Sequence, residues 1–192
     1  MSISVLYMSM SVDGYISGPN DGPDNGLGDG GLRLHDWILD ADRENLVPPT
    51  GAAKPLWDEM MSTGAVLVGR RTAEFVDHWG GDHHDGVPIF VPSHRPGGAA
   101  YPSVTYVTGG IESAMAQAIA AAGDRNVLVH GAYTAQRALA AGVLDELEIH
   151  QIPVLLGAGR RLFDLLPAQV ELEIVRVIDT PEATHLHYKV RR

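Results

Sequence analysis

The sequence predicts a single α/β domain built on a mixed β-sheet, and three observations support this prediction. Short runs rich in β-branched residues alternate with helix-forming stretches along residues 1–192, an order typical of parallel strands joined by crossover helices. Two alternating segments, residues 171–178 and 184–190, predict a C-terminal antiparallel hairpin. The hydrophobic content of 45% suits one packed core in a chain of 192 residues.

The N-terminal part predicts a strand, a long loop, a helix and a second strand. The first strand covers residues 3–10 and ends at a turn around Asp13. Residues 17–31 are rich in Gly, Pro, Asn and Asp, which predicts a long mobile loop. Such a loop in a compact domain is often a lid or a binding loop, although a disordered insertion has the same composition. A helix with proline in its first turn is expected at residues 55–62, followed by a strand at residues 65–69.

The rest of the chain repeats this alternation. Further helices are expected at residues 70–79, 111–122 and 135–141, and further strands at residues 87–91, 104–108, 127–130 and 144–156. With the hairpin, this gives about eight strands and four helices. The predicted sheet is therefore mostly parallel, with antiparallel strands at its C-terminal edge.

The composition favours small-molecule partners over macromolecular ones. A net charge of −10 disfavours binding to nucleic acid or to an anionic membrane surface. The absence of cysteine excludes disulfides and thiolate chemistry. The apolar runs are shorter than the roughly 20 residues of a membrane helix, and no Lys or Arg precedes Arg33, so the basic start of a secretory signal is missing. We expect a cytoplasmic protein.

Four glycine-bearing turns follow predicted strands and suggest a site for a phosphate-bearing cofactor. They are Ser11-Val12-Asp13-Gly14, Gly69-Arg70-Arg71-Thr72, Gly131-Ala132-Tyr133-Thr134 and Gly157-Ala158-Gly159-Arg160. Turns of this kind converge at the carboxyl ends of the strands in an open α/β sheet, where ligands bind. Backbone N–H groups and paired arginines both attract phosphate there. Small residues are also common in ordinary strand-to-helix turns, and an arginine pair can simply be solvated.

Three segments together resemble a known family. They are MSVDGYISG at residues 10–18, LVGRRTAEF at residues 67–75, and the stretch from LVHGAYTAQ to GAGRRLF at residues 128–163. In this order they resemble the dihydrofolate reductase-like superfamily, specifically the C-terminal reductase domain of bacterial riboflavin-biosynthesis proteins and its stand-alone relatives. The resemblance implies a dihydrofolate reductase-like fold over residues 1–192, NADPH as cofactor, and a homodimer.

The resemblance also assigns cofactor contacts. The turn that holds the adenosine 2′-phosphate and the pyrophosphate matches Gly69, Arg70 and Thr72, with Arg71 beside them, and the adenosine side matches Ser93, His94 and Arg95. The segment that wraps the pyrophosphate and the nicotinamide matches Gly131, Ala132, Tyr133 and Thr134. The family has a Gly-Gly pair where this chain has Gly131-Ala132. Alanine tolerates unusual backbone geometry less readily than glycine, so this turn could differ.

Two carboxylates are candidate proton donors. Asp13 lies at a strand end that would face the nicotinamide, and a partly shielded carboxyl can supply or relay a proton. The alternative is a turn aspartate that caps its own backbone before Gly14. Asp36 is the second candidate, and Trp37 would line the same cleft and contact the substrate. The sequence around them lacks the motif of the dihydrofolate reductases proper, which argues against folate.

The predicted function is that of an NADPH-dependent reductase that passes a hydride to a small heterocyclic, pterin- or pyrimidine-like substrate, with residues 17–31 closing over it. One alternative is an NADPH-binding module without catalysis. Another is a metal-dependent hydrolase that uses the histidine-rich residues 77–85. Their uneven spacing favours a solvated loop instead, and no metal is expected. His185 and His187 alternate with apolar residues, so we expect them on an exposed strand face.

Overall fold

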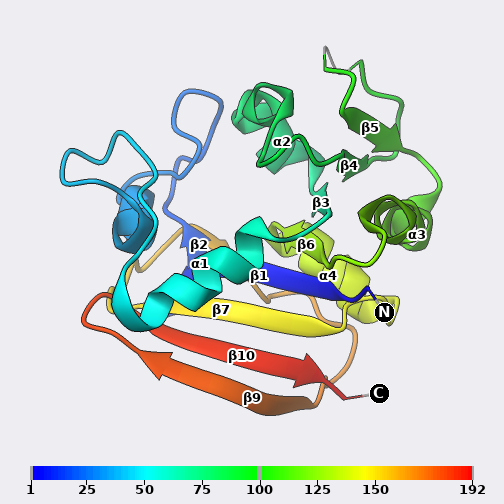
Figure 1. Cartoon of the computed structure of the whole chain (residues 1–192). Coiled ribbons are helices and arrows are strands. Elements are labelled where there is room, and N and C mark those ends of the chain that lie inside the picture. Colours follow the sequence, from blue (N-terminus) through cyan, green and yellow to red (C-terminus); the bar gives the residue numbers. More distant parts are fainter. Residues whose placement is uncertain (1, 99–100, 192) are drawn as a thin grey trace.

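The computed structural model describes residues 2–98 and 101–191, and its main feature is an eight-stranded sheet with the order β5-β4-β3-β6-β1-β7-β10-β9 (Figure 1). The strands are β1 (Ser4–Ser11), β3 (Ala65–Val68), β4 (Ile89–Pro92), β5 (Val104–Val107), β6 (Val127–His130), β7 (Glu146–Ile152), β9 (Leu172–Asp179) and β10 (Thr184–Val190). The strands from β5 to β7 in this order are parallel, and β10 and β9 are antiparallel. The predicted mixed, mostly parallel sheet with a C-terminal hairpin is confirmed.

Helices cover both faces of this sheet. They are α1 (Lys54–Met61), α2 (Arg70–Phe75), α3 (Gly110–Ala122) and α4 (Ala132–Ala140), with 3-10 turns η1 (Gly31–Ile38), η2 (Gly51–Ala53) and η3 (Asp77–Gly81). Leu6 of β1 shares a core with α3 and α4, whereas Val5 and Tyr7 face α2 on the other side. This alternation is the two-residue period of a strand buried on both faces. No helix among the described residues is long and apolar enough to cross a membrane.

A second, two-stranded sheet was not predicted. It pairs β2 (Tyr15–Ser17) with β8 (Arg160–Arg161), both too short to produce a period in the sequence. Gly159 is required next to it, because its φ is +129° and a Cβ there would lie 2.0 Å from the carbonyl oxygen of Ser17. The small sheet therefore fixes the start of the glycine-rich loop, residues 18–30, against the turn after β7.

The glycine-rich loop has defined internal structure rather than that of a disordered insertion. Gly18 N donates to Leu27 O at 2.8 Å, and Gly28 N donates to Asn25 O at 2.9 Å. The Asn20 and Asn25 side-chain amides both donate to the Asp29 carboxylate. Hydrogen bonds from short polar side chains and from the backbone thus hold the loop together, although it has little apolar surface to bury.

The expected exposure of the C-terminal histidines is wrong for His185. It is only 1% exposed, and its Nδ1 lies 2.8 Å from Nδ1 of His150 across the β7–β10 pair. His187, on the same face, is half-buried and contacts Glu146 and Glu148. The alternation itself is correct, but η1 and α1 cover the polar face of this hairpin, so the histidines lie inside.

Candidate active site

Two of the predicted turns meet at the carboxyl ends of β3 and β6. Val68 pairs with His130 in parallel register, so the glycines that follow them, Gly69 and Gly131, emerge side by side. A Cβ on Gly69 would lie 2.8 Å from Thr134 Oγ1, and one on Gly131 would lie 3.3 Å from Thr72 Oγ1. We call these four residues, Gly69, Thr72, Gly131 and Thr134, the glycine corner. The absence of two side chains lets the Thr134 and Thr72 hydroxyls lie close to the backbone of these glycines.

The hydroxyl of Thr134 is the unusual polar group of the glycine corner. Thr134 is 1% exposed, and its Oγ1 has no hydrogen-bond partner among the described residues. A buried hydroxyl without a partner costs about 1–3 kcal/mol. It lies in the first turn of α4, where backbone N–H groups also lack partners within the helix. The corner thus offers several donors that a bound anion could satisfy.

Ala132 fits the turn without strain. Gly131 alone of the pair has a positive φ, +93°, whereas Ala132 begins α4 and is buried. The peptide bonds among the described residues are trans. The replacement of the family's second glycine by Ala132 therefore leaves the turn intact, because only the first position requires glycine.

Arg70 connects the glycine corner to the segment after β4. Its Nη1 donates to Ser93 Oγ at 3.2 Å, its Nε donates to Glu74 at 2.6 Å, and its guanidinium lies over the Tyr106 ring. His94 and Arg95 follow Ser93 and are exposed at the rim. Predicted contacts from two distant segments therefore form one surface.

The remaining predicted cofactor residues lie elsewhere on this rim. Arg71 turns towards the glycine-rich loop, where its guanidinium contacts Asp21. Tyr133 is exposed, and its hydroxyl accepts a hydrogen bond from Arg137 at 2.9 Å. The assignment of both residues to the cofactor, like that of the other residues of the rim, stays a prediction.

Asp13 holds a distant turn in place. Its carboxylate accepts hydrogen bonds from Ser11 Oγ at 2.6 Å, Gly157 N at 2.7 Å and Leu156 N at 3.1 Å. The hydrogen bond from Ser11, followed by those from the two backbone N–H groups, lowers the pKa of Asp13 to about 2. The carboxylate is thus ionised near neutral pH and has no proton to donate in this arrangement. Asp13 therefore lies in the turn after β1 and also caps the turn after β7.

Asp36 and Trp37 lie on η1. Asp36 forms ion pairs with Arg43 at 2.7 Å and Arg33 at 3.6 Å. Trp37 is 9% exposed, and its Nε1 donates to Ser9 Oγ at 3.0 Å.

The Trp37 ring packs against two buried histidines. Its centroid lies 4.3 Å from that of His150 and 4.9 Å from that of His185. We call Ser9, Trp37, His150 and His185 the tryptophan cluster. Because Trp37 packs inside this cluster, little of its side chain is exposed for the predicted substrate contact.

A chain of three histidines runs from Thr63 to the strand end before Gly131. His84 Nε2 lies 3.1 Å from both Thr63 Oγ1 and Thr63 O, His84 Nδ1 lies 2.8 Å from His83 Nδ1, and His83 Nε2 lies 3.1 Å from His130 Nε2. His130 Nδ1 reaches Tyr7 O at 3.0 Å. Burial is the main cause that lowers the pKa of His83 to about 2 and of His130 to about 4.

The predicted solvated character of residues 77–85 is therefore wrong for their histidines. His84 is buried in this chain, and His78, also buried, contacts the Tyr106 hydroxyl at 2.8 Å. The glycines allow the segment to fold back on the sheet, with His78 and Trp79 both at positive φ. Sequence spacing gave no sign of these partners, because they lie on other elements.

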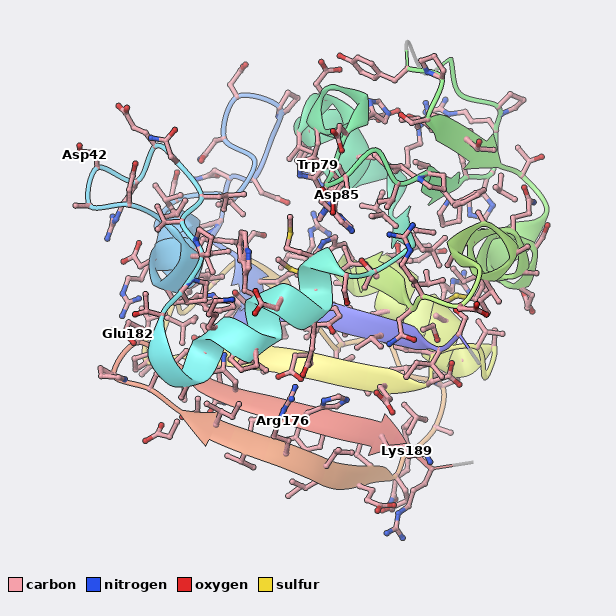
Figure 2. All side chains as sticks on the ribbon, in the orientation of Figure 1. Asp42, Trp79, Asp85, Arg176, Glu182 and Lys189 are labelled. Atoms are coloured by element: carbon pink, nitrogen blue, oxygen red, sulfur yellow. The ribbon has the colours of Figure 1, made fainter. Side chains whose placement is uncertain are left out.

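A metal-competent group occurs on a different surface from the histidine-rich segment. Among the described residues it consists of Glu59, Glu148 and His187. Arg176 of β9 already offsets one of its two carboxylate charges, with Nη2 at 2.7 Å from Glu59 and 3.2 Å from Glu148, and Figure 2 shows Arg176 beneath α1. A cation there would repel the guanidinium. The hydrolase alternative gains no support from either place.

Comparison with known protein families shows to which family the chain belongs. Residues 4–186 match the family described as the RibD C-terminal domain. The chain belongs to this family. Membership indicates an oxidoreductase related to riboflavin biosynthesis, and the resemblance expected from residues 10–18, 67–75 and 128–163 is confirmed. A search of curated proteins finds no match.

Solved structures support the fold. A protein from Shewanella sp. PV-4 assigned to riboflavin biosynthesis superposes with a TM-score of 0.75 and 22% identity, covering 99% of each chain. A diaminohydroxyphosphoribosylaminopyrimidine deaminase/5-amino-6-(5-phosphoribosylamino)uracil reductase from Thermotoga maritima gives a TM-score of 0.65 and 13% identity. The RibD-family chain covers 57% of that longer protein and is itself covered over 99% of its length. At these identities the likeness establishes the dihydrofolate reductase-like fold.

Proposed function

We propose that this RibD-family chain is an NADPH-dependent reductase acting on a small heterocyclic substrate of pterin or pyrimidine type. The observation that carries the proposal is the buried, unpartnered Thr134 hydroxyl beside Gly69 and Gly131. A bound pyrophosphate would accept hydrogen bonds from this hydroxyl and from the N–H groups at the start of α4. The residues present therefore fit the cofactor.

The predicted cofactor residues other than Arg71 each have a defined role in this proposal. Gly69, Thr72, Gly131 and Thr134 would hold the pyrophosphate, with Ala132 and Tyr133 on its nicotinamide side. Arg70 would bind the adenosine 2′-phosphate beside Ser93, His94 and Arg95, since guanidinium groups bind phosphate in a bidentate manner. NADPH, when bound, supplies the hydride. The protein's own residues orient the reactants and keep water out.

Asp13 acts in this proposal as a positioning residue rather than as an acid. Its ionised carboxylate fixes the Leu156-Gly157 turn at the rim where the substrate would bind. Asp36, held by Arg33 and Arg43, would influence the substrate site through η1 and Trp37. The proton that completes the reduction would then come from a neutral donor or from water.

We also propose that the protein acts in the cytoplasm as a homodimer. Strand β9 is an edge of the sheet, and its Ile174, Val175 and Val177 are more than half exposed. An apolar edge strand is a ready surface for pairing with a second copy. The lack of cysteine suits a reducing compartment.

Substitution of Arg70 tests the cofactor assignment. Arg70→Ala should weaken NADPH binding about ten- to hundred-fold, because a hydrogen bond to a charged group contributes roughly 1.5–3 kcal/mol. NADH, which lacks the 2′-phosphate, should bind nearly as before. Fluorescence titration of both cofactors measures this, with the exposed Arg125→Ala as the control. Equal losses for NADPH and NADH would remove Arg70 from the phosphate role.

A further inference from the structure

One carboxylate of the glycine-rich loop lies between two arginines that come from distant parts of the chain. Arg71 of α2 approaches Asp21 with Nη2 at 3.1 Å from Oδ1 and Nε at 3.3 Å from Oδ2. Arg160 of β8 approaches the same carboxylate with Nη2 at 3.1 Å and Nε at 3.2 Å from Oδ2. Arg71 Nη2 also donates to the Asp21 backbone oxygen at 2.7 Å. The loop is thus fastened to both elements through one side chain.

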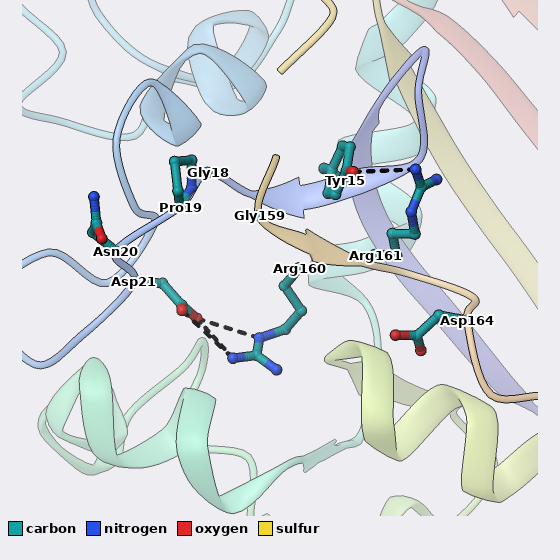
Figure 3. A pocket seen from close by; sticks show the side chains of 9 residues that line it. All are labelled: Tyr15, Gly18, Pro19, Asn20, Asp21, Gly159, Arg160, Arg161 and Asp164. Atoms are coloured by element: carbon teal, nitrogen blue, oxygen red, sulfur yellow. Dashed lines mark hydrogen bonds and ion pairs between the residues drawn. The ribbon is translucent and has the colours of Figure 1, made fainter. Parts of the chain in front are cut away.

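Asp21 and Arg160 line a cavity of about 520 Å³, and Arg71 lies behind Asp21 outside this lining. Figure 3 shows Asp21 and Arg160 joined across it, with Tyr15, Arg161 and Asp164 on the facing wall. Arg161 is held in position, because its Nη1 donates to Asp13 O at 2.9 Å and its Nη2 to the Tyr15 hydroxyl at 3.1 Å. The cavity is therefore wide enough for a ligand group larger than a carboxylate.

The charges around Asp21 do not balance. Two guanidinium groups share one carboxylate, while on the facing wall Arg161 and Asp164 offset each other. Although burial alone would raise the pKa of Asp21, its hydrogen bonds from Arg71 and Arg160 outweigh this and lower the pKa. An excess of one positive charge stays at the fastening. A phosphoryl group, which carries more charge and more acceptor oxygens than a carboxylate, complements two guanidinium groups better.

We propose that Arg71 and Arg160 form a phosphoryl-binding site whose place is taken by the Asp21 carboxylate when no ligand is bound. A phosphoryl-bearing ligand would displace Asp21 and release residues 18–30 from α2 and β8. The inference deepens the proposed function and rests on it for the identity of the ligand, which would be either the cofactor or a phosphorylated substrate. The glycine-rich loop then competes with the ligand for the same arginines.

Binding of inorganic pyrophosphate to the full chain tests the site without any hydride chemistry. Asp21→Asn removes the competing charge and should tighten pyrophosphate binding about ten-fold in calorimetry, the size expected for one charge-assisted contact. When Arg160→Gln is combined with Asp21→Asn, this gain in pyrophosphate affinity should disappear. Asp24→Asn, an exposed aspartate of the same loop, is the matched control and should leave the affinity unchanged. Unaltered or weaker binding by Asp21→Asn would overturn the proposal.

Hydrogen exchange gives a second readout on the wild-type protein. Saturating pyrophosphate should raise the exchange of residues 18–30, and unchanged or slower exchange there would also count against displacement of Asp21. Titrations with NADP⁺, NAD⁺ and ribose 5-phosphate then distinguish the sources, since the natural source is the one whose affinity rises in Asp21→Asn. If pyrophosphate behaves as expected while NADPH does not bind, the site stands and the proposed reductase function fails.

Discussion

The glycine corner and the tryptophan cluster differ in how they use their space. In the corner, two threonine hydroxyls lie against glycines, and the Thr134 hydroxyl lacks a hydrogen-bond partner among the described residues. In the cluster, His185 Nε2 also lacks a partner, but the Trp37 ring packs against His150 and His185 and its N–H donates to Ser9. Unpaired donors at the start of a helix suit an anionic ligand, whereas a tightly packed aromatic ring contributes to stability. Substitutions should therefore affect binding in the first region and folding in the second.

The largest expected effect is a loss of folding stability at acid pH, which comes from buried histidines and not from the exposed rim. Burial lowers the pKa of His35 and His130 to about 4 and of His83 to about 2, below the value of about 6.5 in an unfolded chain. The unfolded state then binds more protons below pH 6.5, so stability falls as the pH falls. At pH 5 each of these histidines costs about 2 kcal/mol. Urea unfolding at pH 7 and pH 5 measures the loss.

Two variants check the source of this acid sensitivity. His130→Gln should make the loss between pH 7 and pH 5 smaller by about 2 kcal/mol. His94→Asn, at an exposed position on the rim, should leave the pH dependence unchanged. An identical pH dependence in wild type and His130→Gln would show that the buried histidine chain does not contribute.

Truncation of Trp37 should have the next largest effect. Trp37→Ala removes a side chain that is 9% exposed and should lower the free energy of unfolding by about 3–5 kcal/mol. Tyr133→Ala, at an exposed aromatic on the rim, should change it by less than about 0.5 kcal/mol. Chemical denaturation of both variants makes the comparison. A small loss for Trp37→Ala would mean that Trp37 is free for the substrate after all.

The smallest and sharpest contrast lies between two buried threonines, both 1% exposed. Thr134→Val removes a hydroxyl without a partner, so it should leave stability unchanged or raise it by about 1 kcal/mol while weakening NADPH binding several-fold. Thr63→Val removes a hydroxyl that donates to Met60 O at 2.8 Å and should lower stability by about 1 kcal/mol. Unfolding curves and cofactor titrations together distinguish them. Equal stability losses would mean that Thr134 has a partner in solution.

The sequence was sufficient to predict the large mixed sheet and the meeting of two distant turns, but not the small β2–β8 sheet. Strand and helix periods, together with glycines after strands, predicted that Gly69 and Gly131 would emerge at one edge. It was insufficient where a side chain's role depends on a partner far along the chain. Asp13 resembles a turn residue or an acid until Leu156 and Gly157 are seen to donate to it. His185 appears exposed because a two-residue period cannot show which face η1 covers.

The contacts at the two ends of the histidine chain determine how many protons its hydrogen bonds require. Three neutral imidazoles carry three N–H protons, yet the chain makes two ring-to-ring contacts and ends on the carbonyl oxygens of Tyr7 and Thr63, so four protons would satisfy it. In the neutral chain the Thr63 hydroxyl can turn from Met60 O to His84 Nε2 and supply the missing donor. One further proton on the histidine chain would supply the missing donor and leave the Thr63 hydroxyl free to donate to Met60 O.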